Sequence, residues 1–222
     1  MNYYKPSATV VAITTPVGET AQHIPQKDLK ALVAYFARIS NPSNKYNNKT
    51  APKLVKFLRE EAHWSPFDMV DIAVEVHTTR DIGRQMLRHY SMRFQEFSQR
   101  YAKVTDELVL RECRLQDTTN RQNSLECTDE ELNQWWEQAQ QAVAWVTMNA
   151  YNQAVEKGVA KEDARAVLPE GMTMSTLFVK GSIRSWIHYL SARQHESTQK
   201  EHRMVAHALA EAMSEYWDFG GE

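Results

Sequence analysis

Apolar residues follow two different periods along the chain, and each change of period marks a new element. The β-branched run ATVVAITTP (8–16) predicts a strand. From Val70 to His77, apolar and polar positions alternate as they do in a half-buried strand. The run MTMSTLFVKG (172–181) is a third candidate strand.

Most of the remaining apolar residues recur with the helical period. Thr128 and Glu131 form a capping-box pattern ahead of a long amphipathic helix, and Gly158 is expected to end that helix. Thr50 and Ser182 are expected to cap two other helices. The predicted helices cover 26–40, 50–62, 80–90, 128–158, 161–168, 182–190 and 198–217.

Two stretches show no clear period. Residues 91–100 are expected to be a loop after a helix, and 104–126 have weak periodicity with an exposed polar loop. The chain has no internal repeat, low-complexity linker or change of composition. One α+β domain over residues 1–222 is therefore the simplest account.

Composition narrows the class of protein. The net charge of −2 comes from 26 basic and 28 acidic residues, which argues against a polybasic, nonspecific nucleic-acid binder. Two cysteines are too few for a disulfide scaffold, and no apolar run approaches the roughly 18–20 residues of a membrane helix. No signal peptide is apparent. We expect a soluble cytoplasmic protein, in the host cytoplasm if its source is a virus.

The near-neutral charge conceals a local basic cluster, opposed by one acid, Glu96. Its members are Arg84, Arg88, His89, Arg93 and Arg100. Arg84 and Arg88 share a helix face, and guanidinium groups beside the Ser98 hydroxyl would suit a phosphate. From residue types alone, a solvated basic surface is the alternative.

The sequence lacks the motifs expected for a cysteine nucleophile, a zinc site or a familiar nucleotide-binding loop. Cys113 and Cys127 have no adjacent histidine, so neither is expected to be a nucleophile. No cysteine or histidine spacing matches a zinc site, and no metal is expected. The chain also lacks a Walker loop and a GxGxxG motif, so any nucleotide must be held in a less familiar way.

One spacing is more specific. Arg88-His89-Tyr90, followed after seven residues by Ser98, resembles the Arg-His-Arg, seven residues, Ser signature of the flavin-dependent thymidylate synthases. Four further blocks resemble this family in its own order. They are ARIS (37–40), HWSPFD (63–68), ARAVLP (164–169) and SIRSWIHYLSARQHESTQKE (182–201). Together the blocks span most of the chain.

The resemblance implies a reaction, a set of cofactors and an assembly. The family methylates dUMP to dTMP with methylenetetrahydrofolate as carbon donor, while FAD, reduced by NADPH, supplies the hydride. The implied fold has mixed helices packed on an antiparallel sheet. The implied assembly is a homotetramer with shared active sites.

The resemblance also implies roles for individual residues. Arg193 matches the arginine that polarises the uracil, Ser98 would position the pyrimidine, and His63 matches a histidine near the flavin and folate cleft. Arg100 and Arg165 would hold the nucleotide phosphate. The implied dUMP-binding residues are Gln85, Arg88, Glu96, Phe97, Ser98, Gln99, Arg100, Arg165 and Arg193.

The implied flavin site departs from the family pattern. Tyr90 replaces the second arginine of the motif, Ser182 stands where asparagine is usual, and Asp68 replaces glutamate. A phenol cannot supply a bidentate cation, so contacts at Tyr90 must differ. The implied FAD-binding residues are Ser65, Asp68, Arg88, His89, Tyr90, Glu96, Ser182, Arg184 and His188.

Two alternatives stay open at this point. A related flavin and folate enzyme could give a different one-carbon product on a pyrimidine nucleotide. A non-catalytic homologue could use the basic stretch 84–103 to bind nucleic acid.

Overall fold

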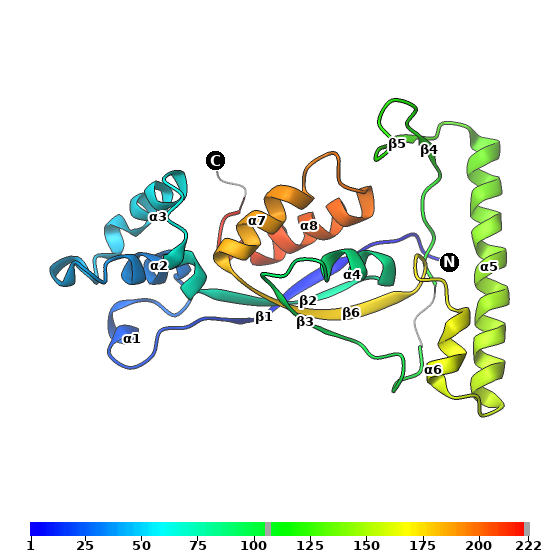
Figure 1. Cartoon of the computed structure of the whole chain (residues 1–222), viewed down its shortest axis with the longest axis horizontal. Helices are drawn as coiled ribbons and strands as arrows, with labels where there is room; N and C mark the ends of the chain where they lie inside the picture. The colour runs from blue at the N-terminus through cyan, green and yellow to red at the C-terminus, as the bar shows by residue number, and fades with distance from the viewer. Residues whose placement is uncertain (105–107, 220–222) are drawn as a thin grey trace.

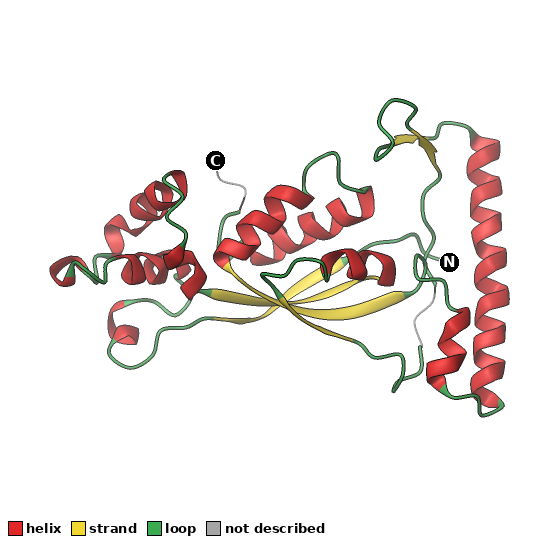
Figure 2. Cartoon of the chain, in the orientation of Figure 1, coloured by secondary structure: helices red, strands yellow, loops and turns green. Residues whose placement is uncertain are grey.

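A four-stranded antiparallel sheet forms the centre of the protein. The computed structural model describes residues 1–104 and 108–219. The strand order is β1-β2-β6-β3, and Asp71 at the start of β2 faces Ser182 at the end of β6. The strands are β1 (Ser7–Ile13), β2 (Asp71–Thr79), β3 (Arg93–Glu96) and β6 (Met174–Ser182). The predicted α+β class with an antiparallel sheet is confirmed (Figure 2).

Helices surround this sheet unevenly. Figure 1 shows α7 and α8 side by side on one face of the sheet, α2 and α3 at one end of the molecule, and α5 at the other. The α-helices are α1 (Thr20–His23), α2 (Leu29–Ala37), α3 (Ala51–Glu60), α4 (Arg80–Met86), α5 (Glu130–Glu156), α6 (Lys161–Ala164), α7 (Ile183–Arg193) and α8 (Lys200–Met213). Short 3-10 helices cover Pro42–Asn44, Asn48–Thr50, Ser65–Met69 and Arg165–Val167. In the described residues no helix is both long and apolar enough to cross a bilayer.

The core lies between the sheet and the helices α7 and α8. Ile72, Val74 and Val76 alternate along β2 and are fully buried, as the sequence pattern predicts. Trp186 of α7 is also fully buried, and its indole Nε1 donates to the Ile72 carbonyl at 3.1 Å. Each such apolar side chain contributes about 1.5–3 kcal/mol by leaving water. This packing fixes the position of α7 against the sheet.

The ends of the helices agree only in part with the sequence. The Ser182 hydroxyl caps α7 by accepting from the Ser185 N–H at 3.2 Å, and Gly158 ends α5 with φ of 85°. The predicted capping box at Thr128 is wrong, since the Asp129 carboxylate accepts from the Leu132 N–H at 3.1 Å. Asp129 directly precedes the first helical residue, which puts its carboxylate within reach of the free N–H groups.

Thr50 precedes α3 but does not cap it. Its hydroxyl accepts from Arg38 Nη2 at 2.8 Å, and no side-chain cap forms at this end of the helix. The guanidinium of Arg38 is a stronger donor than a backbone N–H. The Thr50 hydroxyl therefore ties α3 to the end of α2.

Short strands occupy two stretches that were expected to be loops. Within 91–100, β3 pairs with β6 and places Phe94 opposite Val179. Within 104–126, β4 (Arg114–Gln116) and β5 (Ser124–Glu126) form a hairpin around a polar turn. Three or four residues are too few to show a period of two. The part of this predicted loop at 105–107 lies outside the described residues.

Candidate active site

The C-terminal end of α7 carries a paired arginine and histidine. Arg193 is the last residue of α7, and its Nε donates to His89 Nε2 at 3.0 Å. His89 lies just after α4, and its ring meets the Tyr189 ring edge to face at 4.7 Å between centroids. The structure thus joins two residues that lie 104 positions apart in the sequence.

His89 is a neutral acceptor for Arg193. Burial lowers the pKa of His89, and the nearby charges of Arg193 and Arg88 lower it further. The ring therefore carries its proton on Nδ1 and accepts at Nε2. The two terminal nitrogens of Arg193 have no hydrogen-bond partner among the described residues. They are available to an anionic or carbonyl ligand.

Gln85 of α4 is half-buried and is linked to this pair through His202 and Tyr189. Its Oε1 is 3.1 Å from His202 Nδ1, and its Nε2 donates to Gln199 Oε1 at 2.9 Å. Both partners come from the C-terminal part of the chain. The side-chain amide is therefore held from two sides, while part of its surface reaches solvent.

The segment 96–100 continues from β3 into a turn. Glu96 accepts from Arg80 Nη1 at 3.0 Å and from the Ser175 hydroxyl at 3.3 Å. Gln99 is buried, and its Nε2 has no hydrogen-bond partner among the described residues. A buried amide donor without a partner is costly, so a ligand oxygen at this position would stabilise it.

The two predicted phosphate ligands, Arg100 and Arg165, are neighbours. Arg100 Nε donates to a Glu162 carboxylate oxygen at 3.4 Å, and Arg165 Nε donates to the Glu162 carbonyl at 3.3 Å. Phe97 is 41% exposed, and the turn begins where the Ser98 backbone carbonyl accepts from the Tyr101 N–H at 3.1 Å. Within the described residues, no hydrogen bond or ion pair links Arg100 and Arg165 to the pair formed by Arg193 and His89.

The N-terminal end of α7 carries a second, exposed cluster. Asp68 accepts from the Ser182 hydroxyl at 2.9 Å and pairs with Arg184 Nη1 at 2.9 Å. Asp68 lies in the 3-10 helix that begins at Ser65, and both of those residues are exposed. Three of the predicted flavin ligands therefore meet at one point.

Aromatic rings lie next to this cluster. The His188 ring packs on Trp64 at 4.7 Å between centroids, while His63 is exposed and meets Phe57 edge to face at 6.3 Å. Tyr90 is 92% exposed, and its carbonyl accepts from Arg93 Nη1 at 3.0 Å. Arg88 is also exposed at the end of α4.

Reasoning from residue types missed a set of hydrogen-bonded polar residues behind the site. Tyr189, Glu201 and His202 are buried, and Gln199, which bonds to Glu201, is exposed. Gln199 and Glu201 belong to the Gln-x-Glu part of the block 182–201, so a signal for them was present. Tyr189 and His202 carried none, because apolar helical spacing does not reveal a hydrogen bond between two helices.

Comparison with a solved structure defines the class of fold. The crystal structure of a UMP/dUMP methylase, PolB from Streptomyces cacaoi, bound with 5-Br dUMP, matches with a TM-score of 0.80. It is 22% identical, and the match covers 99% of this chain and 94% of that chain. The two proteins share one fold over their whole length.

Sequence comparison identifies the family. The model of the family described as "Thymidylate synthase complementing protein" matches residues 22–217. A flavin-dependent thymidylate synthase from Synechocystis is 50% identical over 80% of each chain, and a probable one from Paramecium bursaria Chlorella virus 1 is 43% identical over 92% of each chain. This chain belongs to the same family, so the family predicted from the motif at Arg88 and Ser98 is confirmed.

Proposed function

We propose that this protein converts dUMP to dTMP, with methylenetetrahydrofolate as carbon donor and NADPH as reductant. The observation that carries the proposal is the guanidinium of Arg193, which neutral His89 holds through Nε and whose terminal nitrogens have no partner among the described residues. A fixed cation beside the uracil stabilises negative charge that develops on the ring and makes C5 nucleophilic. Family membership and the names of the similar relatives support the same reaction.

The remaining nucleotide contacts follow from the charged and polar groups around residues 96–100 and 165. Arg100 and Arg165 converge at Glu162 and would take the phosphate, while Ser98 positions the pyrimidine. The Nε2 of Gln99, which has no partner within residues 1–104 and 108–219, supplies a donor for a ligand oxygen. The similar fold of the UMP/dUMP methylase supports a pyrimidine nucleotide as ligand.

The exposed cluster at the N-terminal end of α7 fits a flavin dinucleotide. Arg184 uses Nη1 for Asp68 and is 44% exposed, so the rest of its guanidinium can meet a pyrophosphate. The rings of His188 and Trp64, tilted by 60° to each other, offer an aromatic surface beside it. When bound, FAD supplies the hydride for the reduction. Ser65, Tyr90 and the Ser182 hydroxyl complete this site.

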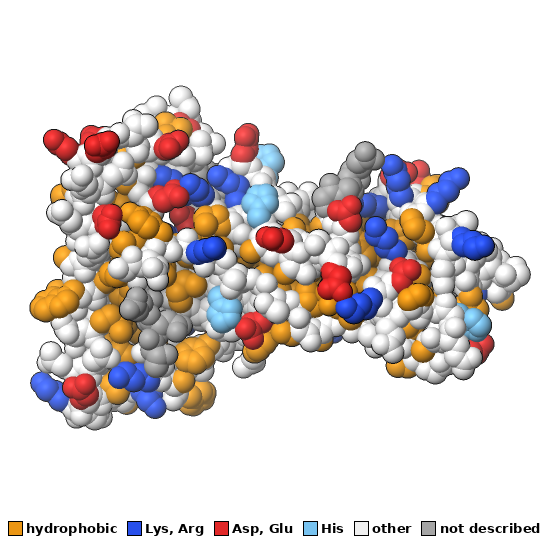
Figure 3. All heavy atoms as spheres, turned by 180° about the vertical axis from the view of Figure 1, so that it is seen from behind, with side chains coloured by type: hydrophobic (Ala, Val, Ile, Leu, Met, Phe, Trp, Pro, Cys, Tyr) orange, Lys and Arg blue, Asp and Glu red, His pale blue; other side chains and the backbone are white. Residues whose placement is uncertain are grey.

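We also propose a cytoplasmic homotetramer with shared sites. At the end of the molecule formed by α5, hydrophobic side chains reach the surface (Figure 3), and Trp145 is 71% and Trp135 61% exposed. Such a face is typical of an interface between subunits. In a tetramer another copy would complete each site, with His63 near the folate.

The decisive experiment is turnover with product identification. Purified protein is incubated with dUMP, methylenetetrahydrofolate, NADPH and FAD, and the nucleotide product is identified by mass. We expect dTMP and a yellow protein with a flavin absorbance band. A hydroxymethylated product would assign the related one-carbon chemistry, and colourless protein that gains no flavin and binds DNA would overturn the proposal.

Basic and acidic side chains are mixed over the face shown in Figure 3, and such a mixed surface does not favour the binding of a polyanion such as DNA.

A further inference from the structure

We propose that a chain of hydrogen bonds behind the site locks the Gln85 amide in one orientation. This orientation would leave the second N–H of its Nε2 for an oxygen acceptor on the nucleotide. The positioning residues are Tyr189, His202, Gln199 and Glu201. The inference rests on the proposed function, because Gln85 is a nucleotide-binding residue only if the family resemblance that supports this function holds for dUMP.

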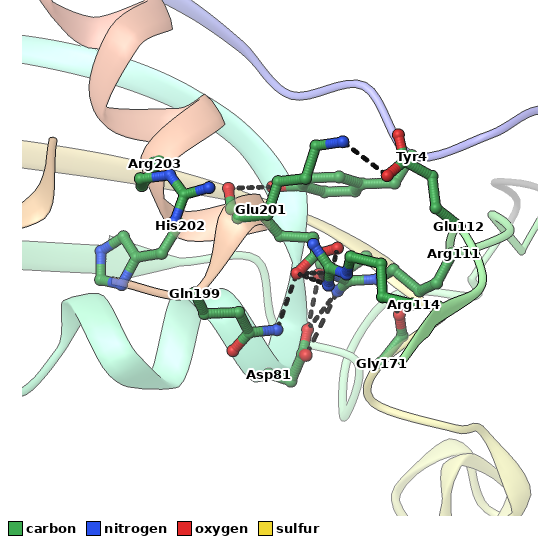
Figure 4. Close-up of polar contacts among 12 residues, drawn as sticks. Tyr4, Asp81, Arg111, Glu112, Arg114, Gly171, Gln199, Glu201, His202 and Arg203 are labelled. Atoms are coloured by element: carbon green, nitrogen blue, oxygen red, sulfur yellow. Dashed lines mark hydrogen bonds and ion pairs between the residues drawn. The ribbon is translucent and has the colours of Figure 1, made fainter. Parts of the chain in front are cut away.

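The chain begins at a buried carboxylate. Glu201 is 3% exposed, and its oxygens accept from Arg114 Nη2 at 2.6 and 2.8 Å and from Gln199 Nε2 at 2.9 Å. Figure 4 shows the Gln199 amide and the guanidinium groups of Arg111 and Arg114 converging on it. Burial raises the pKa of Glu201, but these donors more than offset it, so the pKa is lowered overall. An ionised carboxylate accepts only.

This carboxylate fixes the direction of the next two bonds. Because Gln199 must donate to Glu201 through Nε2, its Oε1 is the atom that faces Gln85 at 2.9 Å. Gln85 must then donate through its own Nε2. Its Oε1 is left for the partner on the other side, which is His202 Nδ1 at 3.1 Å.

The other end of the chain imposes the same direction independently. His202 is fully buried. Burial, and after it the positive charge of nearby Arg193, lowers the pKa of His202 to about 3, so the ring is neutral. Burial raises the pKa of Tyr189, which therefore keeps its proton and donates to His202 Nε2 at 2.9 Å. With Nε2 accepting, the ring proton lies on Nδ1 and points to Gln85 Oε1.

The two directions agree at Gln85. An amide that could flip would present oxygen instead of N–H to the nucleotide in part of the population. Tyr189 also packs its ring against His89, which in turn holds Arg193. The same buried tyrosine therefore supports the Gln85 amide and the guanidinium proposed to polarise the uracil.

The test compares His202→Phe with His202→Asn in the flavin-loaded protein. An asparagine amide can replace Nδ1–H as donor to Gln85, whereas phenylalanine cannot. We expect His202→Phe to raise the Kd for dUMP about tenfold, equivalent to about 1.4 kcal/mol, and His202→Asn to restore it to within about threefold. The Kd for dUMP is read from the change in flavin absorbance. The affinity for FAD is measured by flavin fluorescence, and this affinity should be the same in both variants and in wild type.

Gln199→Leu serves as a second probe because Gln199 is exposed, so its replacement leaves the core intact. We expect it also to raise the Kd for dUMP. Tyr189→Phe removes one buried hydroxyl from the chain. Its matched control is Tyr151→Phe, which removes a buried hydroxyl that accepts from the Val104 N–H elsewhere. Only Tyr189→Phe should weaken dUMP binding.

Gln85→Leu separates the two levels of the proposal. If Gln85→Leu binds dUMP as wild type does, the nucleotide role of Gln85 fails. If Gln85→Leu weakens binding but Gln199→Leu and His202→Phe do not, the positioning chain alone is overturned. In the double variant of Gln85→Leu with His202→Phe, we expect no loss beyond that of Gln85→Leu, because His202 acts through Gln85.

Discussion

The two ends of α7 differ in how their polar groups are held. At the C-terminal end, Arg193 bonds to the neutral, half-buried His89. The His89 ring packs on Tyr189, which bonds to the fully buried His202. At the N-terminal end, Arg184 meets Asp68 at 2.9 Å, and both side chains are more than 40% exposed. One helix therefore has a rigid end and an adjustable end.

Burial explains the difference. An exposed ion pair contributes about 0–1 kcal/mol, because water and salt screen it and both side chains lose freedom. Removing one partner from a buried hydrogen bond costs about 1–3 kcal/mol, because the remaining buried partner cannot form a replacement hydrogen bond with water. The rigid end suits a step in which charge develops at a fixed point, and the adjustable end suits the binding of a large cofactor.

Arg193→Ala is the strongest test of the rigid end. We expect dTMP formation to fall by about 10²–10³-fold or more, since loss of a fixed donor at a developing anion has effects of this size. Flavin absorbance of the purified protein should be largely retained. Equal activity of Arg193→Ala and wild type would refute the role assigned to this arginine.

The rigid end should also make stability depend on pH. His202 has a pKa near 3 in the folded protein against an ordinary 6.5, so only the unfolded chain takes up its proton below about pH 6.5. The free energy of unfolding should therefore fall as pH drops from 6.5, by up to about 1.4 kcal/mol per unit. The lowered pKa of His89 acts in the same direction.

Urea unfolding at several pH values checks this dependence. The His202→Asn variant has no imidazole to protonate, so its stability should decline less steeply between about pH 6.5 and about pH 5. His188→Asn is the matched control, because His188 is exposed. A slope in His202→Asn equal to that of wild type would show that His202 is not the group responsible.

The contrast between the ends also explains what the sequence could predict. Patterns of period and capping located β2, β6 and α7, because Ile72, Val74 and Ser182 report burial and capping within a few residues. The motif at Arg88 and Ser98 gave the family. These are local signals.

Long-range pairing produced no such signal. The bond from Arg193 to His89 spans 104 positions, and the one from Tyr189 to His202 joins two helices. Both depend on how α7 and α8 pack on the sheet. Likewise, β3 forms because β6 offers a free edge to residues that alone have no strand pattern. The rigid end of α7 was therefore the harder one to foresee.

At the adjustable end, Arg184→Ala should have a moderate and selective effect. Loss of the exposed pair with Asp68 should change the free energy of unfolding by no more than about 1 kcal/mol. The affinity for FAD should fall several-fold, because the guanidinium proposed to bind the pyrophosphate is lost. Thermal unfolding and flavin fluorescence give the two values. Lys180→Ala, which removes the exposed partner of Asp71, is the control for general loss of charge.

Tyr90→Arg should have the smallest effect. The Tyr90 side chain is 92% exposed and no described contact involves its phenol, so the free energy of unfolding should change by less than about 0.5 kcal/mol. Arginine restores the usual motif, and FAD affinity should be kept or strengthened by the added cation. Titration of the apoprotein with FAD measures this. A large loss of affinity would mean that the phenol itself contacts the cofactor, and the exposed end of α7 would then be a rearranged flavin site.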